Sequence, residues 1–129
     1  AESEFRAIYW ESDRLDAKME IRGTPSVNLR VQPHYNKAQI VAYLYDMDSW
    51  GWGKLITHGV ITLPDANWGD KVRVDFDMVT TAYDVPAGHK VVMAIDTKDP
   101  YYKSPTSADF YLDFQYKTSE QNTVTIPTL

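Results

Sequence analysis

The amino-acid sequence predicts an all-β fold, an antiparallel β-sandwich or jelly roll, and three observations support this. Apolar and polar residues alternate in several short runs, as in strands with one buried face. Gly, Pro, Asn and Asp separate these runs, in the way that turns separate the strands of a sandwich. No long segment has the apolar stripe of an amphipathic helix. The chain has 129 residues, so we expect one β-sandwich domain over residues 1–129.

Three segments show the alternation most clearly. Apolar residues occupy every second position in segments 27–32 and 72–78, and charged or polar residues fill the positions between them. This pattern is typical of strands that are covered on one side only. Segment 54–63 alternates as well, and Gly59 near its middle predicts a bulge or a close approach.

Two other segments are almost wholly apolar, which predicts central strands that are buried on both faces. They are QIVAYLY at 39–45 and VVMAI at 91–95. We therefore expect their side chains in the core, specifically Val41, Leu44, Ala94 and Ile95.

Shorter runs complete the set of expected elements. Further strands are expected at 5–10, 19–22, 110–116 and 123–126. Turns are expected at 23–25, 48–53, 64–70 and 86–88, and a long loop at 99–107.

Composition excludes several classes of function. The chain has no Cys, which excludes a disulfide framework, a thiolate nucleophile and a Cys-based zinc site. The net charge is −5 and there is no basic run, so we expect no nucleic-acid partner. No apolar stretch is long enough for a membrane helix, so we expect no membrane partner.

The sequence predicts no catalytic residue and no cofactor. A hydrolase serine needs the strand-to-helix elbow Gly-x-Ser-x-Gly to present its hydroxyl beside an oxyanion hole. None of the seven Ser lies in that pattern. The three His, at positions 34, 58 and 89, are interpreted as solvated or structural.

Asp46 and Asp48 lie in DMDSWG, which partly resembles the opening of a calcium loop. Such a loop needs oxygen ligands at its fifth and twelfth positions, which here are Trp50 and Thr57. We therefore predict no metal site of this type, and we interpret both Asp as hydrogen-bonding a turn. A different cation site is left open, built on Asp13, Asp16 or Asp48.

His89 follows a glycine at the start of an apolar strand. No second metal ligand stands at a suitable spacing from it. We interpret His89 as a structural turn residue whose ring bonds nearby backbone. His58, inside an alternating strand, has the same interpretation.

The most distinctive segment is SWGWG at 49–53, with Trp50 and Trp52 in a Gly-rich turn. Large apolar rings are costly to expose to water, and exposed clusters of them mark interfaces or ligand sites. Three interpretations are open: the rings cover the core, pack against another domain, or stack on a sugar. Trp10 and Trp68 are candidates for the same surface.

Several segments, taken in order, resemble one family. They are YWESDRL at 9–15, MEIRGTPSVNLRV at 19–31, VAYLYDMD at 41–48, LITHG at 55–59, VPAGHKVVMAI at 85–95 and TVTIP at 123–127. Together they are similar to the C-terminal non-catalytic domain of X-Pro dipeptidyl-peptidases, cocaine-esterase-like acyl esterases and α-amino-acid ester hydrolases.

This resemblance implies a jelly roll of the galactose-binding-domain-like type. It also implies a partner, an α/β-hydrolase domain of the same polypeptide that carries a Ser-Asp-His triad. The chain alone is then not an enzyme but an accessory domain of a serine hydrolase, which packs on the catalytic domain and helps to shape substrate access. The alternative is an independent carbohydrate-binding module, with carbohydrate as the partner of the tryptophans.

Overall fold

The computed structural model of the chain describes residues 6–33, 39–62, 72–98, 112–114 and 123–129. The described residues form strands and no helix, so none of them belongs to a helix that could cross a membrane. The strands are β1 Arg6–Glu11, β2 Met19–Gly23, β3 Ser26–Pro33, β4 Gln39–Met47, β5 Gly53–Thr62, β6 Val72–Asp77, β7 Thr81–Val85, β8 Lys90–Lys98, β9 Leu112–Phe114 and β10 Thr123–Thr125.

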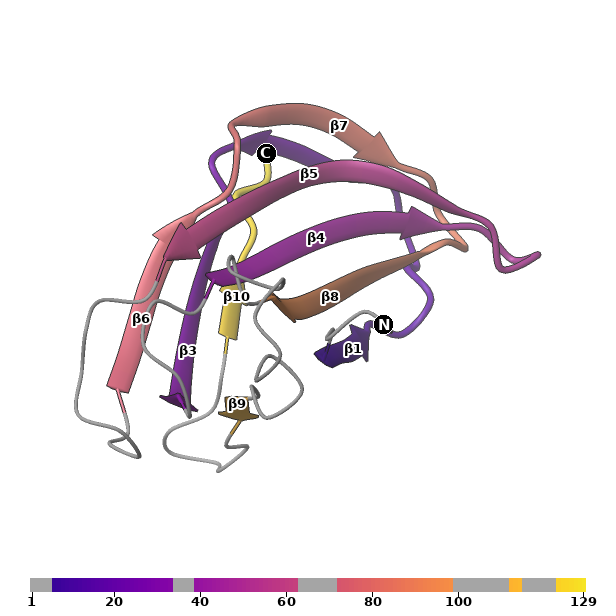
Figure 1. Cartoon of the computed structure of the whole chain (residues 1–129). Helices are drawn as coiled ribbons and strands as arrows, with labels where there is room; N and C mark the ends of the chain where they lie inside the picture. Colours follow the sequence, from indigo (N-terminus) through magenta and orange to yellow (C-terminus); the bar gives the residue numbers. More distant parts are fainter. Residues whose placement is uncertain (1–5, 34–38, 63–71, 99–111, 115–122) are drawn as a thin grey trace.

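The strands form an antiparallel β-sandwich, as the alternating patterns predict. The first layer is a four-stranded sheet in the order β1-β8-β4-β5. The second layer contains the sheet β10-β3-β6, with β9 also paired to β3, and the two-stranded sheet β2-β7. Figure 1 shows β5, β4 and β8 running side by side, with β3 and β6 crossing them steeply at one end. All pairings are antiparallel.

The second layer is bent where β2 passes into β3 and β6 passes into β7. At this bend the backbone of Met78 donates a hydrogen bond to the carbonyl oxygen of Pro25, at 2.8 Å. The backbone N–H of Val79 instead reaches the first layer, where it donates to the carbonyl oxygen of His58 at 2.9 Å. The hydroxyl of Thr57 donates to the carbonyl oxygen of Val79 at 2.7 Å. The bend is therefore hydrogen-bonded directly to β5.

Gly59 permits this contact between the layers. A Cβ atom at Gly59 would lie 2.6 Å from the carbonyl oxygen of Asp77 and 2.9 Å from Cα of Met78. Both distances are shorter than a Cβ atom tolerates, and both neighbouring atoms belong to backbone. Of the two alternatives predicted at Gly59, a bulge or a close approach, the close approach is confirmed.

The core lies between the two layers. Its buried side chains are Ile21, Val27, Leu29, Val74, Phe76, Met78 and Val85 from the second layer, and Ile40, Ala42, Leu44, Val91, Met93 and Ile95 from the first. In β8 the run Val91–Ile95 is buried on both faces, as predicted, and Ala94 and Ile95 are each only 4% exposed.

The prediction for β4 is wrong in one respect, because this strand is buried on one face only. Burial alternates along it: Ile40, Ala42 and Leu44 are in the core, whereas Val41 and Tyr43 are half-buried. The outward positions carry mainly apolar and aromatic side chains, so the composition of the segment resembles that of a strand buried on both sides. Val41 is therefore not a core residue.

β7, a short strand that pairs with β2 over its whole length, is not among the strands predicted from the sequence. Its sequence, TAYDV, has only one fully buried apolar side chain, Val85, so the hydrophobic pattern is weak. Three other expectations lie largely or wholly outside the described residues: the turn at 64–70, the loop at 99–107, and the strand at 110–116, of which 112–114 are described as β9.

Candidate functional site

The candidate site lies at the end of the sandwich where β4 turns into β5. Asp48 closes this turn, since its Oδ1 accepts the backbone N–H of Trp50 at 2.9 Å and of Trp52 at 3.0 Å. In the backbone, the N–H of Asp48 donates to the carbonyl oxygen of Trp52, and the carbonyl oxygen of Asp48 accepts the N–H of Gly51. Gly51 has a φ of 89°, a conformation that glycine adopts without strain. The sequence thus places one carboxylate and one glycine where a tight turn requires them.

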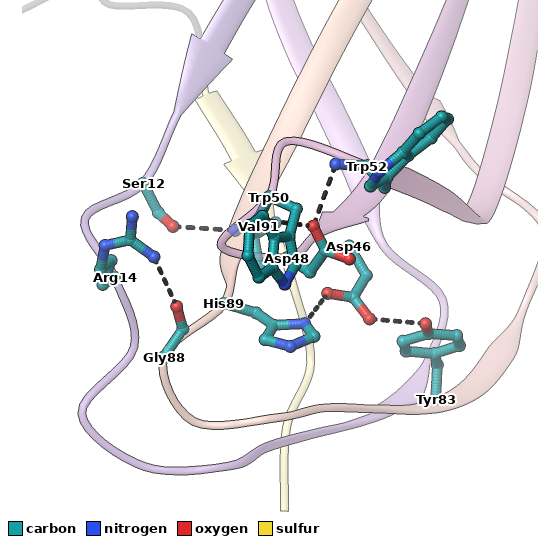
Figure 2. Close-up of polar contacts among 10 residues, drawn as sticks. All are labelled: Ser12, Arg14, Asp46, Asp48, Trp50, Trp52, Tyr83, Gly88, His89 and Val91. Atoms are coloured by element: carbon teal, nitrogen blue, oxygen red, sulfur yellow. Dashed lines mark hydrogen bonds and ion pairs between the residues drawn. The ribbon is translucent and has the colours of Figure 1, made fainter.

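Both tryptophan side chains of this turn are exposed to solvent. The exposed fraction is 86% for Trp50 and 77% for Trp52, so neither ring covers the core of the sandwich. The connection between β4 and β5 extends past the neighbouring strands in Figure 1, and the ring of Trp52 is directed away from the other labelled residues in Figure 2. The turn therefore presents two large apolar rings on a hydrogen-bonded support.

The structure describes only one of the other two candidate tryptophans. Trp10 lies on the edge strand β1 with 53% of its side chain exposed, and it has no ring contact with another described residue. Trp68 lies outside the described residues.

Asp46 differs from the expected turn residue, because it is buried in β4 and bonds side chains. Its exposed fraction is 6%. One oxygen, Oδ1, lies 2.7 Å from Nδ1 of His89, and the other, Oδ2, accepts the hydroxyl of Tyr83 at 2.7 Å. Figure 2 shows Asp46 between these two rings. Side chains alternate between the two faces of a strand, so Asp46 lies on the same face of β4 as Leu44. Its carboxylate therefore points toward the interior of the sandwich.

The sequence predicted that the ring of His89 bonds nearby backbone. In the structure it bonds a side chain instead, that of Asp46. Because a carboxylate only accepts hydrogen bonds, Nδ1 is the nitrogen that donates. The interaction joins the start of β8 to the end of β4. His58 lies on β5 with its ring stacked near that of Tyr43, at a centroid distance of 6.5 Å.

Tyr83, which was not among the residues predicted from the sequence, completes this partly buried cluster. Burial raises the pKa of Tyr83 to about 12, and the hydrogen bond to Asp46 and the charge of Asp46 act in the same direction. The hydroxyl therefore keeps its proton near neutral pH and remains a donor. The ammonium group of Lys54 lies 5.8 Å from the centre of the Tyr83 ring, within the range of a cation–π contact.

The loop after β1 is fastened to the turn before β8 at the same end of the sandwich. Ser12 Oγ accepts the backbone N–H of Val91 at 2.9 Å, and Arg14 donates to the carbonyl oxygen of Gly88 at 3.0 Å. Leu15 exchanges backbone hydrogen bonds with Gly88 and His89, both 2.8 Å long. These contacts, drawn in part in Figure 2, hold the loops of this end in place.

The described residues contain no arrangement for nucleophilic catalysis. Ser12, Ser26 and Ser49 are the serines among them, and none is hydrogen-bonded to a histidine. No group of three His, Asp or Glu in the described part of the chain could hold a metal ion. Asp13, Asp16 and Asp48 are all described and belong to no such group. A cation site that combines one of them with other oxygen ligands stays a prediction.

Solved structures with a similar fold come from longer hydrolases. An α-amino acid ester hydrolase has a TM-score of 0.79 and 12% identity, with 95% of this chain and 25% of that chain covered. An aminopeptidase from a marine sediment Thaumarchaeota archaeon has a TM-score of 0.77 and 10% identity, covering 93% and 25%. A CocE/NonD family hydrolase from Staphylococcus aureus has a TM-score of 0.69 and 9% identity, covering 96% and 33%. At these identities the likeness concerns the fold.

The chain thus spans between a quarter and a third of the length of these similar structures. No curated protein matches it in sequence. The family comparison is specific, since residues 6–125 match the X-Pro dipeptidyl-peptidase C-terminal non-catalytic domain. The match covers nearly the whole chain and all of the strands described above. The chain therefore belongs to the family of X-Pro dipeptidyl-peptidase C-terminal non-catalytic domains.

Proposed function

We propose that this chain is the accessory domain of a serine hydrolase and packs on an α/β-hydrolase catalytic domain of the same polypeptide. The match to a non-catalytic C-terminal domain family supports this. So does the fold, which recurs as a quarter to a third of longer hydrolase chains. The parent enzyme is an X-Pro dipeptidyl-peptidase or an acyl esterase.

The observation that carries the proposal is the exposure of Trp50 and Trp52 on a turn fixed by Asp48. Tryptophan is enriched at protein interfaces and often supplies much of the binding energy there. Because the turn is already ordered, little conformational entropy is lost when a partner covers it. A projecting apolar turn of this kind also suits a wall of the substrate entrance, which is the role we assign to it.

Carbohydrate binding is the second candidate function, and the same two rings favour it. An exposed aromatic ring on a rigid turn offers an apolar platform for the face of a sugar. In that case the chain would be an independent carbohydrate-binding module, and the rings would respond to soluble sugars without any catalytic domain.

The complete reading frame and an activity assay test the proposal. We expect a hydrolase segment with the Gly-x-Ser-x-Gly elbow in the same polypeptide. The complete polypeptide should hydrolyse X-Pro dipeptide amides or acyl esters, and the 129-residue chain should hydrolyse neither. A glycosidase segment in place of the hydrolase would favour the carbohydrate-binding function. Hydrolysis by the chain alone that disappears on replacing a single Ser or His would contradict the non-catalytic role.

A further inference from the structure

The outer face of the β1-β8-β4-β5 sheet contains a shallow depression of about 270 Å³ that no described residue covers. Val92 and Ala94 of β8 line it, together with the rings of Tyr43 and Tyr45 of β4. These two rings lie 6.1 Å apart, centre to centre. Two carboxylates, Glu11 and Asp96, also line the depression.

The apolar surface continues beyond the depression onto β5. Leu55 is paired with Tyr45 and Val60 with Val41, so both point to the same outer face. About half of each of these two side chains is exposed. At its other end the depression reaches Met47 and Gly53, which flank the tryptophan turn. The depression therefore extends to the two residues on either side of the tryptophan turn.

The two carboxylates of the depression differ in their partners. Glu11 accepts a hydrogen bond from the ammonium group of Lys90 at 3.1 Å. No hydrogen bond or ion pair joins Asp96 to a side chain that the structure describes, and no basic side chain is among the described residues that line the depression. Burial raises the pKa of Asp96, which is the effect of removing water from a carboxylate without supplying a donor. A cation from a partner would stabilise the charged carboxylate and so offset the unfavourable free energy of its burial.

Aromatic walls beside a carboxylate suit one kind of cation in particular. A guanidinium group stacks on tyrosine rings and donates paired hydrogen bonds to a carboxylate in the same plane. An ammonium group makes the cation–π contact and a single charged hydrogen bond. Both groups are common on the surface of a protein partner, and arginine is enriched at interfaces.

We propose that the catalytic domain docks on the outer face of the β1-β8-β4-β5 sheet and places a guanidinium or ammonium group against Asp96 and the rings of Tyr43 and Tyr45. This inference rests on the proposed accessory function and names the surface that serves it. Three observations select a protein domain as the occupant: the greater length of the similar hydrolase chains, an acidic group with no partner among the described side chains, and the position of the depression next to the tryptophan turn.

Carbodiimide labelling of carboxyl groups, read by mass spectrometry, tests the proposal in the complete polypeptide and in the 129-residue chain. Asp75, which is exposed on β6 in the other layer, is the matched control. We expect Asp96 to be labelled at least about tenfold more slowly in the complete polypeptide, because labelling then requires the interface to open. Asp75 should be labelled equally in both.

Two variants make the test independent of labelling chemistry. Asp96→Lys puts an ammonium group where the partner's cation should sit, so it should separate the domains and raise the rate of limited proteolysis between them about tenfold or more. Asp75→Lys should leave that rate unchanged. Asp96→Asn removes the charge with little change in shape, and should give a smaller increase in the same direction if the lysine variant fails to fold.

Each outcome separates this inference from the proposed function. Equal labelling of Asp96 in both proteins, in a polypeptide that does hydrolyse its substrates, would overturn the docking surface and leave the accessory function intact. A complete polypeptide without a hydrolase segment would overturn both. Slow labelling of Asp96 already in the 129-residue chain would show that the chain covers its own depression, and would also overturn the docking surface.

Discussion

The hydroxyl of Tyr83 on β7 donates a hydrogen bond to Oδ2 of Asp46 on β4 at 2.7 Å, and so connects the two layers of the sandwich. The second oxygen of Asp46 is held by His89 at the start of β8. A buried carboxylate is tolerated only when such donors replace its water. This cluster closes the core at the end that carries Trp50 and Trp52, and it keeps the strands beside the turn together.

Tyr83→Phe should destabilise the chain, because it leaves a buried oxygen of Asp46 without its donor. We expect a loss of about 1.5–3 kcal/mol in the free energy of unfolding, the usual range for a hydrogen bond to a charged group. Urea unfolding followed by circular dichroism measures this. Tyr43→Phe is the matched control, since the hydroxyl of Tyr43 has no hydrogen bond to a described residue, and its effect should stay within about 0.5 kcal/mol. Equal effects of the two variants would contradict the role given to Tyr83.

Asp96→Asn should change the pH dependence of stability. Burial raises the pKa of Asp96 above its ordinary value of 3.8, so the folded chain binds this proton more tightly than the unfolded chain. The corresponding stability is fully present below pH 3.8 and is lost as pH rises through the raised pKa. Asn cannot ionise and avoids this loss. Thermal unfolding of the 129-residue chain should show a higher Tm for Asp96→Asn at pH 7, and a smaller difference at pH 3.

Asp75→Asn serves as the control for this measurement, because Asp75 is exposed on β6. Its effect on Tm should be small and should not follow the same pH profile. A lower Tm for Asp96→Asn at pH 7 would mean that the carboxylate has a favourable partner within the chain.

Gly59→Ala should be strongly destabilising, because the added Cβ would meet the backbone of the opposite layer at 2.6 Å. Overpacking against backbone typically costs about 1–3 kcal/mol or more. Gly53→Ala is the matched control: its Cβ would lie 3.7 Å from the ring of Tyr45, an ordinary contact. Chemical denaturation of both variants decides the matter. A Gly59→Ala chain as stable as Gly53→Ala would show that the two layers are not in contact at the bend.

The strands that could be predicted from the sequence are those whose buried positions are mostly filled by apolar residues. Segment 91–95 is apolar at every position because β8 is a central strand, between β1 and β4, and all five side chains of this segment are buried. Gly59 was informative because a glycine inside an alternating strand usually marks either a bulge or a close approach. β7 could not be predicted because it is short and only Val85 among its residues is a fully buried apolar side chain.

The site was predicted only in part, because its key contacts join residues far apart in the sequence. Asp48 and the tryptophans could be found since a turn is local. Asp46, Tyr83 and His89 come from three different strands or turns, and only the fold brings them together. The same holds for Asp96 beside Tyr43, because neither residue marks the outer face of a sheet until the strand order β8-β4 is known.

The exposure of Trp50 and Trp52 in the complete polypeptide tests the central claim most directly. Oxidative footprinting read by mass spectrometry resolves each ring, and the 129-residue chain provides the reference in which both are exposed. If the chain is an accessory domain that docks through this surface, at least one of the two rings should be oxidised at a small fraction of its reference rate in the complete polypeptide. Equal oxidation of both rings in the two proteins, or protection that appears only when sugars are added, would contradict it.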